Sequence, residues 1–229
     1  MQAAEWDNGT ISWVFFDVGE TLVDESKPIR ESIRQFVEQA AKLGYRIEPH
    51  IVEQALMHYH GLFSSFPMRD VMEQLIRSEE DRLEIRKGMV YRKDWDEPFA
   101  DAVGILEQLS RHYKLGIIAN QSAGTAARLE QYGMLKYISV VCSSAEEGLS
   151  KPDVRFYERA LGEARCKAEH AVMIGDRIDN DVIPAKRVGM RAIWVRQGLA
   201  RHQPIPLDHT APDVMVERLD GIMNYLARI

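Results

Sequence analysis

The sequence has only two cysteines in 229 residues, and it has no apolar run long enough to cross a membrane. Cys142 and Cys166 lack the spacing of metal ligands, so we expect reduced thiols, with Cys142 buried in a strand. A membrane-spanning helix needs about 20 mostly apolar residues. The first ten residues also lack the basic and apolar regions of a secretion signal. These absences predict a cytoplasmic protein with no membrane association.

Concentrated positive charge, internal repeats and low-complexity segments are missing as well. The 29 lysines and arginines stand against 35 aspartates and glutamates, which gives a net charge of −6. Because no dense basic patch stands out, we expect no nucleic-acid partner. A composition of 45% hydrophobic and 28% charged residues is ordinary for a globular protein. The length allows one domain or one domain with an insertion, and it leaves both a monomer and a homodimer open.

The stretch ISWVFFDVGETLVDE, residues 11–25, organises the rest of the chain. A short aromatic and β-branched run leads directly to Asp17 and is bounded by Gly19, which predicts a buried strand that ends at the acid. In open α/β sheets the carboxyl ends of the strands face the ligand crevice. An acid is costly there unless it is paired or coordinates a cation. Taken alone, the stretch also fits a strand followed by an ordinary polar turn.

The remaining chain consists of a helical block and an alternating part. Residues 25–94 show about four helical stretches with apolar faces and no strand signal. From residue 95 onward strands and helices alternate, which predicts an α/β fold with a Rossmann-like parallel sheet and helices on both faces. We therefore expect a core of residues 1–24 and 95–229. The block at 25–94 interrupts this core after the first strand and is predicted to be a helical cap.

Polar residues follow four predicted strands at their carboxyl ends. They are Asp17, Asn120, Lys151 and the acidic group Asp176, Asp179 and Asp181. Each has a simpler explanation: the amide suits a helix cap, the lysine a solvated loop, and the acids a helix start. Four such residues at four strand ends favour a single site, and its crowded carboxylates require a cation. Hard oxygen ligands beside a lysine suit Mg²⁺ and a phosphate dianion.

The order D-x-G-x-T, strand-ending Asn, Lys-Pro before a helix, and G-D-x-x-x-x-D resembles the haloacid dehalogenase superfamily of hydrolases with an inserted α-helical cap. The resemblance runs from Trp13 to the last helix. It implies a Mg²⁺-dependent phosphatase of a small phosphorylated metabolite. Asp17 would be the nucleophile that becomes an aspartyl-phosphate, and Lys151 would neutralise it. The resemblance further implies substrate binding by Gly19, Asn120 and Lys151, and metal binding by Asp17, the carbonyl of Gly19, Asp176 and Asp181.

Two positions depart from the family's pattern. Gly19 stands where the phosphatases usually carry a second Asp as general acid and base, and Ala119 replaces the usual Ser or Thr before the Asn. Ser122 could supply a hydroxyl, although a helix-start role fits it better. Glu20, next to Gly19 in the sequence, and the cap segment His58–His60 offer titratable groups that could replace the missing acid. The simpler interpretation is that neither takes part in catalysis.

The missing acid keeps other functions open. One is hydrolysis of a carbon–halogen bond, which needs no metal, so the acidic cluster argues against it. Another is hydrolysis of a carbon–phosphorus bond, which requires a Schiff-base lysine from the cap. The candidates Lys27, Lys42, Lys87 and Lys93 do not lie on an apolar helical face. The third is a low-turnover regulatory protein that binds metal or phosphate.

Overall fold

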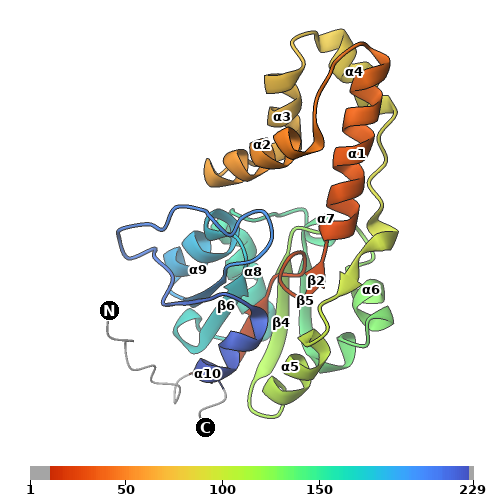
Figure 1. The fold of residues 1–229 in the computed structure, drawn as a ribbon. Coiled ribbons are helices and arrows are strands. Elements are labelled where there is room, and N and C mark those ends of the chain that lie inside the picture. The colour runs from red at the N-terminus through yellow and green to blue at the C-terminus, as the bar shows by residue number, and fades with distance from the viewer. Residues whose placement is uncertain (1–10, 227–229) are drawn as a thin grey trace. The chain divides into compact units, whose positions relative to one another are not determined.

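The computed structural model describes residues 11–226, and the chain divides into two compact units (Figure 1). The first unit combines the chain up to Asp24 with the chain from Glu97 onward, and the second runs from Glu25 to Asp96. Among the described residues, no helix is both long and apolar enough to span a membrane. The role of the second unit as a cap stays a prediction.

A six-stranded parallel sheet forms the centre of the first unit, in the order β5-β4-β1-β6-β7-β8. Its strands are β1 (Trp13–Phe16), β4 (Lys114–Ala119), β5 (Ile138–Ser143), β6 (Ala171–Gly175), β7 (Arg191–Val195) and β8 (Val214–Val216). Strand β1 pairs with β4 on one side and with β6 on the other, and all four of its residues are buried. A strand covered on both faces is apolar throughout, which accounts for its unbroken hydrophobic sequence.

The order of the strands reverses at β1. The chain moves from β1 to β4 and β5 on one side, then returns past β1 to β6, β7 and β8. Right-handed crossovers place the helices of the two halves on opposite faces of the sheet. These helices are α5 (Ala102–Leu109) and α6 (Thr125–Gln131) on one face, with α8 (Val154–Ala164) and α9 (Ile183–Arg187) on the other. This arrangement confirms the predicted Rossmann-like α/β class.

Local sequence signals account for the start and burial of α8. The Asp153 side chain accepts a hydrogen bond from the Arg155 amide at 2.9 Å and so caps the helix. The sequence predicts a helix that starts at Pro152, and the structure begins it two residues later, at Val154. Its apolar stripe is buried against the sheet, and the stripe consists of Phe156, Tyr157, Ala160, Leu161 and Ala164.

The short helices of the first unit lie at strand ends and at the carboxyl end of the chain. They are α7 (Ser144–Glu147), the 3₁₀ turns Leu135–Tyr137, Ala168–His170 and Leu219–Ile222, the π-helical turn Ile178–Val182, and α10 (Met223–Leu226). The alternation of strands and helices after residue 95 predicts an ordinary helix after β6. The structure instead places the π turn before the short α9. Such turns interrupt regular helices most often at functional sites.

The second unit is helical throughout. It contains α1 (Ser26–Lys42), α2 (Pro49–Gly61), α3 (Pro67–Leu75), α4 (Glu79–Lys87) and the 3₁₀ turn Lys93–Trp95. Prolines open α2 and α3, where a missing amide hydrogen costs nothing. The Ser78 hydroxyl caps α4 by accepting from the Asp81 amide at 3.2 Å. The unit buries a small core of its own, which includes Phe36, Val52, Val71, Ile76 and Ile85.

Two short strands, which the sequence did not predict, lie where the chain passes between the units. Strands β2 (Val23–Asp24) and β3 (Glu97–Pro98) pair in antiparallel fashion. Next to them, Lys93 Nζ contacts Glu25 Oε1 at 2.8 Å and Asp96 Oδ2 at 2.7 Å. Burial opposes the charge of Lys93, but the two carboxylates outweigh it and raise its pKa. A protonated, ion-paired lysine is a poor Schiff-base nucleophile, which argues against that role for Lys93.

Candidate active site

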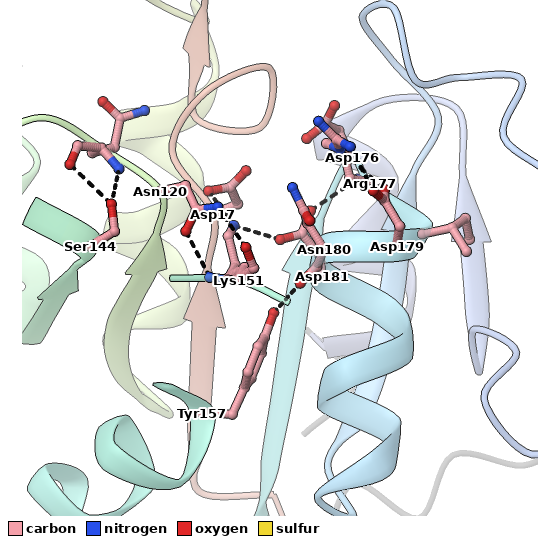
Figure 2. Close-up of polar contacts among 12 residues, drawn as sticks. Asp17, Asn120, Ser144, Lys151, Tyr157, Asp176, Arg177, Asp179, Asn180 and Asp181 are labelled. Carbon is pink, nitrogen blue, oxygen red and sulfur yellow. Dashed lines mark hydrogen bonds and ion pairs between the residues drawn. The ribbon is translucent and has the colours of Figure 1, made fainter. Parts of the chain in front are cut away.

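Asp17 follows β1 directly and lies at the carboxyl end of the sheet (Figure 2). Its amide continues the strand ladder by donating to the Ile174 carbonyl of β6 at 2.9 Å. The residue is only 8% exposed. The central position of β1 therefore fixes the backbone of Asp17. Its carboxylate lies at the point where the strand order reverses, which is where ligands bind in such sheets.

A tight turn follows Asp17. The Val23 amide donates to the Val18 carbonyl at 2.9 Å, and Gly19 bridges to Val23. Glu20 adopts φ 53°, a left-handed conformation that is uncommon outside glycine. Its carbonyl accepts a hydrogen bond from Nε2 of Gln197. The loop after β7 thus holds the turn that carries Gly19.

The Glu20 carboxylate is directed toward the loop after β7. A Cβ atom built on Gly198 would lie 2.4 Å from Glu20 Oε2, so a larger residue at that position would make the carboxylate move. The negative charge of Glu20 also contributes to raising the pKa of Asp176. The alternative role of Glu20 in proton transfer stays a prediction.

Lys151 is buried and bridges two acids. Its Nζ lies 2.7 Å from Asp17 Oδ1 and 2.6 Å from Asp181 Oδ1, and its side chain is only 2% exposed. The Asn120 side chain holds the backbone of the same lysine, because Oδ1 accepts from the Lys151 amide at 2.8 Å and Nδ2 donates to its carbonyl at 2.9 Å. These contacts are incompatible with a solvated loop lysine and with Asn120 as a helix cap.

The loop after β6 brings two further acids to the site. Asp176 follows the strand directly, and the π turn Ile178–Val182 carries Asp181 back toward Gly175. A Cβ on Gly175 would lie 2.3 Å from the Asp181 carboxyl carbon, so this glycine permits the close approach. Asp181 is fully buried, and its Oδ2 accepts from the Arg177 amide at 2.9 Å.

The structure therefore gathers three carboxylates around one lysine. Asp17, Asp176 and Asp181 each offer an oxygen within 4.8 Å of the others, and all three residues are buried. Lys151 is the one cation that the described structure places in contact with two of them, Asp17 and Asp181. Three negative charges against one positive charge leave an excess that a divalent cation would neutralise. Buried oxygen ligands of this kind fit Mg²⁺.

The electrostatics of the group follow from burial and crowding. Burial and the neighbouring acids Asp181 and Asp17 raise the pKa of Asp176 well above its usual range. Burial also raises the pKa of Asp181 to about 6, although Lys151 opposes that shift. For Lys151 burial acts to lower the pKa, but the two carboxylates outweigh it and raise the value. The lysine therefore stays charged, and the acids are short of positive charge.

Asn120 and Asp179 each have specific partners in the structure. The Asn120 side chain supports the Lys151 backbone, and its binding of phosphate stays a prediction, because Nδ2 carries a second hydrogen and the residue is exposed. Asp179 does not join the acidic group, because it pairs with Arg177 at 2.5 Å. Ser122 contributes its carbonyl at the start of α6, where Thr125 Oγ1 donates to it at 3.0 Å.

Sequence reasoning missed three residues that support the site. Tyr157 donates its hydroxyl hydrogen to the Asn180 carbonyl (Figure 2), and Trp194 Nε1 donates to the Asp176 carbonyl at 2.7 Å. Gln203 contacts the π turn from a distant loop. No local pattern marks these residues, because each acts on a segment at least 18 positions away in the sequence.

A second group of potential ligands, Cys142, Glu147 and Glu163, lies near α8. Arg159 contacts Glu147 at 3.1 Å and Glu163 at 3.2 Å, so a cation already lies against both acids and offsets part of their charge. Burial and the acids raise the pKa of the Cys142 thiol to about 12. A thiol must lose its proton to bind a metal, and we assign no metal to this group.

Comparisons with known proteins agree with this geometry. The profile of the haloacid dehalogenase-like hydrolase family matches residues 14–195. A glyceraldehyde 3-phosphate phosphatase of Methanothermobacter thermautotrophicus is 28% identical over 217 residues, which cover 89% of this chain and 93% of that protein.

Two solved structures are similar as well. A HAD phosphatase from Thermococcus onnurineus has a TM-score of 0.63 at 23% identity, covering 94% of this chain and 98% of the other. A 2-haloacid dehalogenase from Pseudomonas syringae has a TM-score of 0.59 at 25% identity, covering 95% and 99%. The first similarity supports the fold alone. Phosphatases and dehalogenases thus both occur among the similar proteins.

Proposed function

Because this chain belongs to the haloacid dehalogenase-like hydrolase family, we propose that it hydrolyses the phosphate ester of a small metabolite through a covalent intermediate on Asp17. One observation carries the proposal. Lys151 Nζ binds Asp17 Oδ1 and Asp181 Oδ1 at once, within a group of three buried carboxylates. Such a group has no evident structural use, and its charge balance suits a cation and a phosphate dianion.

In the proposed reaction the Asp17 carboxylate attacks phosphorus, and the bond to the leaving oxygen breaks. Lys151 fixes the carboxylate through Oδ1 and opposes the negative charge of the transferring group. Asn120 keeps the lysine in place by binding both backbone polar groups of that residue. Water then hydrolyses the acyl phosphate, releasing inorganic phosphate and restoring the carboxylate.

The acidic group fits Mg²⁺, with Asp17, Asp176 and the Gly19 carbonyl as proposed ligands and Asp181 in support. When bound, the cation would supply the positive charge that three buried carboxylates and a dianionic substrate require. The raised pKa values of Asp176 and Asp181 describe the same shortage of positive charge. Removal of the cation by a chelator is therefore expected to abolish activity.

The absence of a side chain at Gly19 restricts the substrates. No second acid stands two residues after Asp17 to protonate the departing oxygen. A general acid contributes roughly 10²–10⁴-fold, most of all for a poor leaving group. The enzyme is therefore expected to favour phosphates with a low leaving-group pKa, unless Glu20 supplies the proton. Glyceraldehyde 3-phosphate, named for the 28% identical relative, is an alkyl phosphate with a poor leaving group, so it is the metabolite to compare with an aryl phosphate: rapid turnover of it requires a proton donor other than position 19.

The proposal is tested by phosphate release over a panel of phosphorylated metabolites, with and without Mg²⁺. The Asp17→Asn variant keeps the shape of the side chain but cannot form an acyl phosphate, so we expect no turnover. Full activity in a chelator, or appreciable activity of the variant, would remove the nucleophile assignment. An aryl phosphate belongs in the panel because its leaving group needs little protonation.

Carbon–halogen hydrolysis is the second candidate, and the vacancy at Gly19 is the observation that favours it. A dehalogenase would release halide from a 2-haloacid in the presence of a chelator. The buried group of Asp17, Asp176 and Asp181 argues against this candidate, because a metal-free site gains nothing from three unneutralised acids. Halide release without metal, and no phosphate release with it, would reverse the preference.

A further inference from the structure

The loop between β7 and β8 inserts one buried polar side chain toward the candidate site. Gln203 is 3% exposed, while its neighbours His202 and Pro204 are exposed. An uncharged amide is costly to bury unless its polar atoms are bonded. The contacts of Gln203 therefore indicate what this buried side chain does.

Both ends of the Gln203 amide bind the π turn. Oε1 accepts from the Ile178 amide at 2.6 Å, and Nε2 donates to Asp179 Oδ1 at 2.8 Å. Arg177 binds the same carboxylate through Nε at 3.1 Å. Gln203 thus fixes the Ile178 amide and the Asp179 carboxylate of the turn, which lie 25 and 24 positions before it in the sequence.

These contacts lie between the two acids that the turn connects. Asp176 precedes the turn, and Asp181 lies within it, with its carboxylate against Lys151 and the Arg177 amide. With Asp179 held by Gln203 and Arg177, the acid cannot turn toward the crowded carboxylates. Without Gln203, the buried Ile178 amide would lose its acceptor, and the turn would gain conformations in which the two acids no longer face one cation.

We propose that Gln203 is a positioning residue, which holds the π turn Ile178–Val182 so that Asp176 and Asp181 present their carboxylates to the same divalent cation. This inference rests on the proposed function, because it assumes that the acidic group binds Mg²⁺. It adds a specific claim: the geometry of the cation site depends on a side chain from the β7–β8 loop.

A purely structural role would have a different signature. Loss of two buried hydrogen bonds would then lower the stability of the fold and leave the Mg²⁺ affinity of the folded protein unchanged. A positioning role changes the affinity itself. Substitution of groups that orient metal ligands typically weakens metal binding by about 10–100-fold.

The test compares Gln203→Met with the wild-type protein by calorimetric titration of Mg²⁺ and by the Mg²⁺ concentration that gives half-maximal phosphatase activity. Methionine matches the length of glutamine but removes both hydrogen bonds. We expect the dissociation constant to rise about 10-fold or more, and kcat at saturating Mg²⁺ to recover toward the wild-type value. An unchanged dissociation constant would overturn the positioning role.

Tyr113→Phe is the matched control. It removes one buried hydrogen bond, from the Tyr113 hydroxyl to the Leu226 carbonyl at 2.8 Å, just before the start of β4 at the opposite end of the sheet. We expect it to lower stability without altering Mg²⁺ affinity. If it weakened Mg²⁺ binding as strongly as Gln203→Met, the effect would be a general consequence of destabilisation, and the inference would fail.

A second variant covers the case in which Gln203→Met does not fold. Gln203→Glu keeps an acceptor for the Ile178 amide but places a carboxylate against Asp179, so weaker Mg²⁺ binding is again expected, and wild-type affinity would overturn the inference. Mg²⁺ binding by the wild-type protein separates the proposed function from the role of Gln203. A wild-type protein that binds no Mg²⁺ would overturn the proposed function together with this inference, whereas normal wild-type binding with an unaffected Gln203→Met would overturn this inference alone.

Discussion

Replacing Lys151 by methionine removes one positive charge from a group of three buried acids while keeping the length of the side chain. The lysine side chain is 2% exposed and contacts Asp17 at 2.7 Å and Asp181 at 2.6 Å. Removing one partner of a buried ion pair typically costs about 3–5 kcal/mol, because the other charge stays buried without compensation. We expect a loss of stability of that order at about pH 7 without Mg²⁺.

The loss should depend on pH in a specified direction. Lys151 at present opposes the rise in the pKa of Asp181, which burial holds at about 6. In Lys151→Met that pKa rises further, so the native state binds a proton more readily than the unfolded chain does. Asp181 is then protonated at about pH 5, and the destabilisation should be smaller there than at about pH 7.

Urea unfolding of the wild type and Lys151→Met at both pH values, with and without Mg²⁺, measures this effect. Lys186→Met is the control, because Lys186 forms an ion pair with Asp213 that is more exposed, and exposed pairs contribute about 0–1 kcal/mol. In assays with Mg²⁺ we also expect kcat to fall by about 10²–10³-fold. A stability loss equal to that of the control, or a wild-type kcat, would refute the assignment of Lys151.

Three further predictions follow from the site. Gly19→Asp should raise the turnover of alkyl phosphates more than that of aryl phosphates, and Glu20→Gln should leave turnover nearly unchanged. If turnover does not depend on the leaving-group pKa and Glu20→Gln loses most of its activity, Glu20 is the proton donor. Because the pKa of Asp181 is raised in the native state, the stability of the metal-free protein should fall as pH rises from about 4 to about 6. Mg²⁺ should therefore raise the melting temperature more at about pH 7 than at about pH 5. Gly175→Ala should displace the Asp181 carboxyl, which lies 2.3 Å from the added Cβ, and weaken Mg²⁺ binding; unchanged affinity would show that the site adjusts.

Much of the fold was predictable, because its signals are local. The apolar run of β1 predicted a strand covered on both faces, and the alternation after residue 95 predicted the parallel sheet. The two-residue pair of β2 and β3 was not predictable, since it brings together segments more than 70 residues apart with no periodicity of their own. The π turn after β6 was missed for a related reason: the contacts that support it come from other parts of the chain.

The candidate site was predictable in its acids and its lysine, but not in how they are supported. The positions of Asp17 and Asp176 follow from strand ends, which meet at one edge of a parallel sheet, whereas Lys151 comes after α7 in the loop that follows β5. The engagement of Asn120 with the Lys151 backbone depends on a contact across 31 positions in the sequence. The burial of Gln203 within an exposed loop likewise has no sequence signal. Residue type therefore indicated the chemistry, and tertiary contacts decided which polar groups are available for it.

The most direct test of the account is the detection of a phosphorylated Asp17. Rapid acid quenching during turnover of an aryl phosphate with Mg²⁺, followed by peptide mass spectrometry, locates any phosphoryl group. We predict modification of the peptide that contains Asp17, appearing in a burst before steady state because Gly19 offers no base for its hydrolysis, and no modification in Asp17→Asn. Steady turnover with no phosphoryl group on Asp17, in an enzyme whose Asp17→Asn variant remains active, would contradict the account.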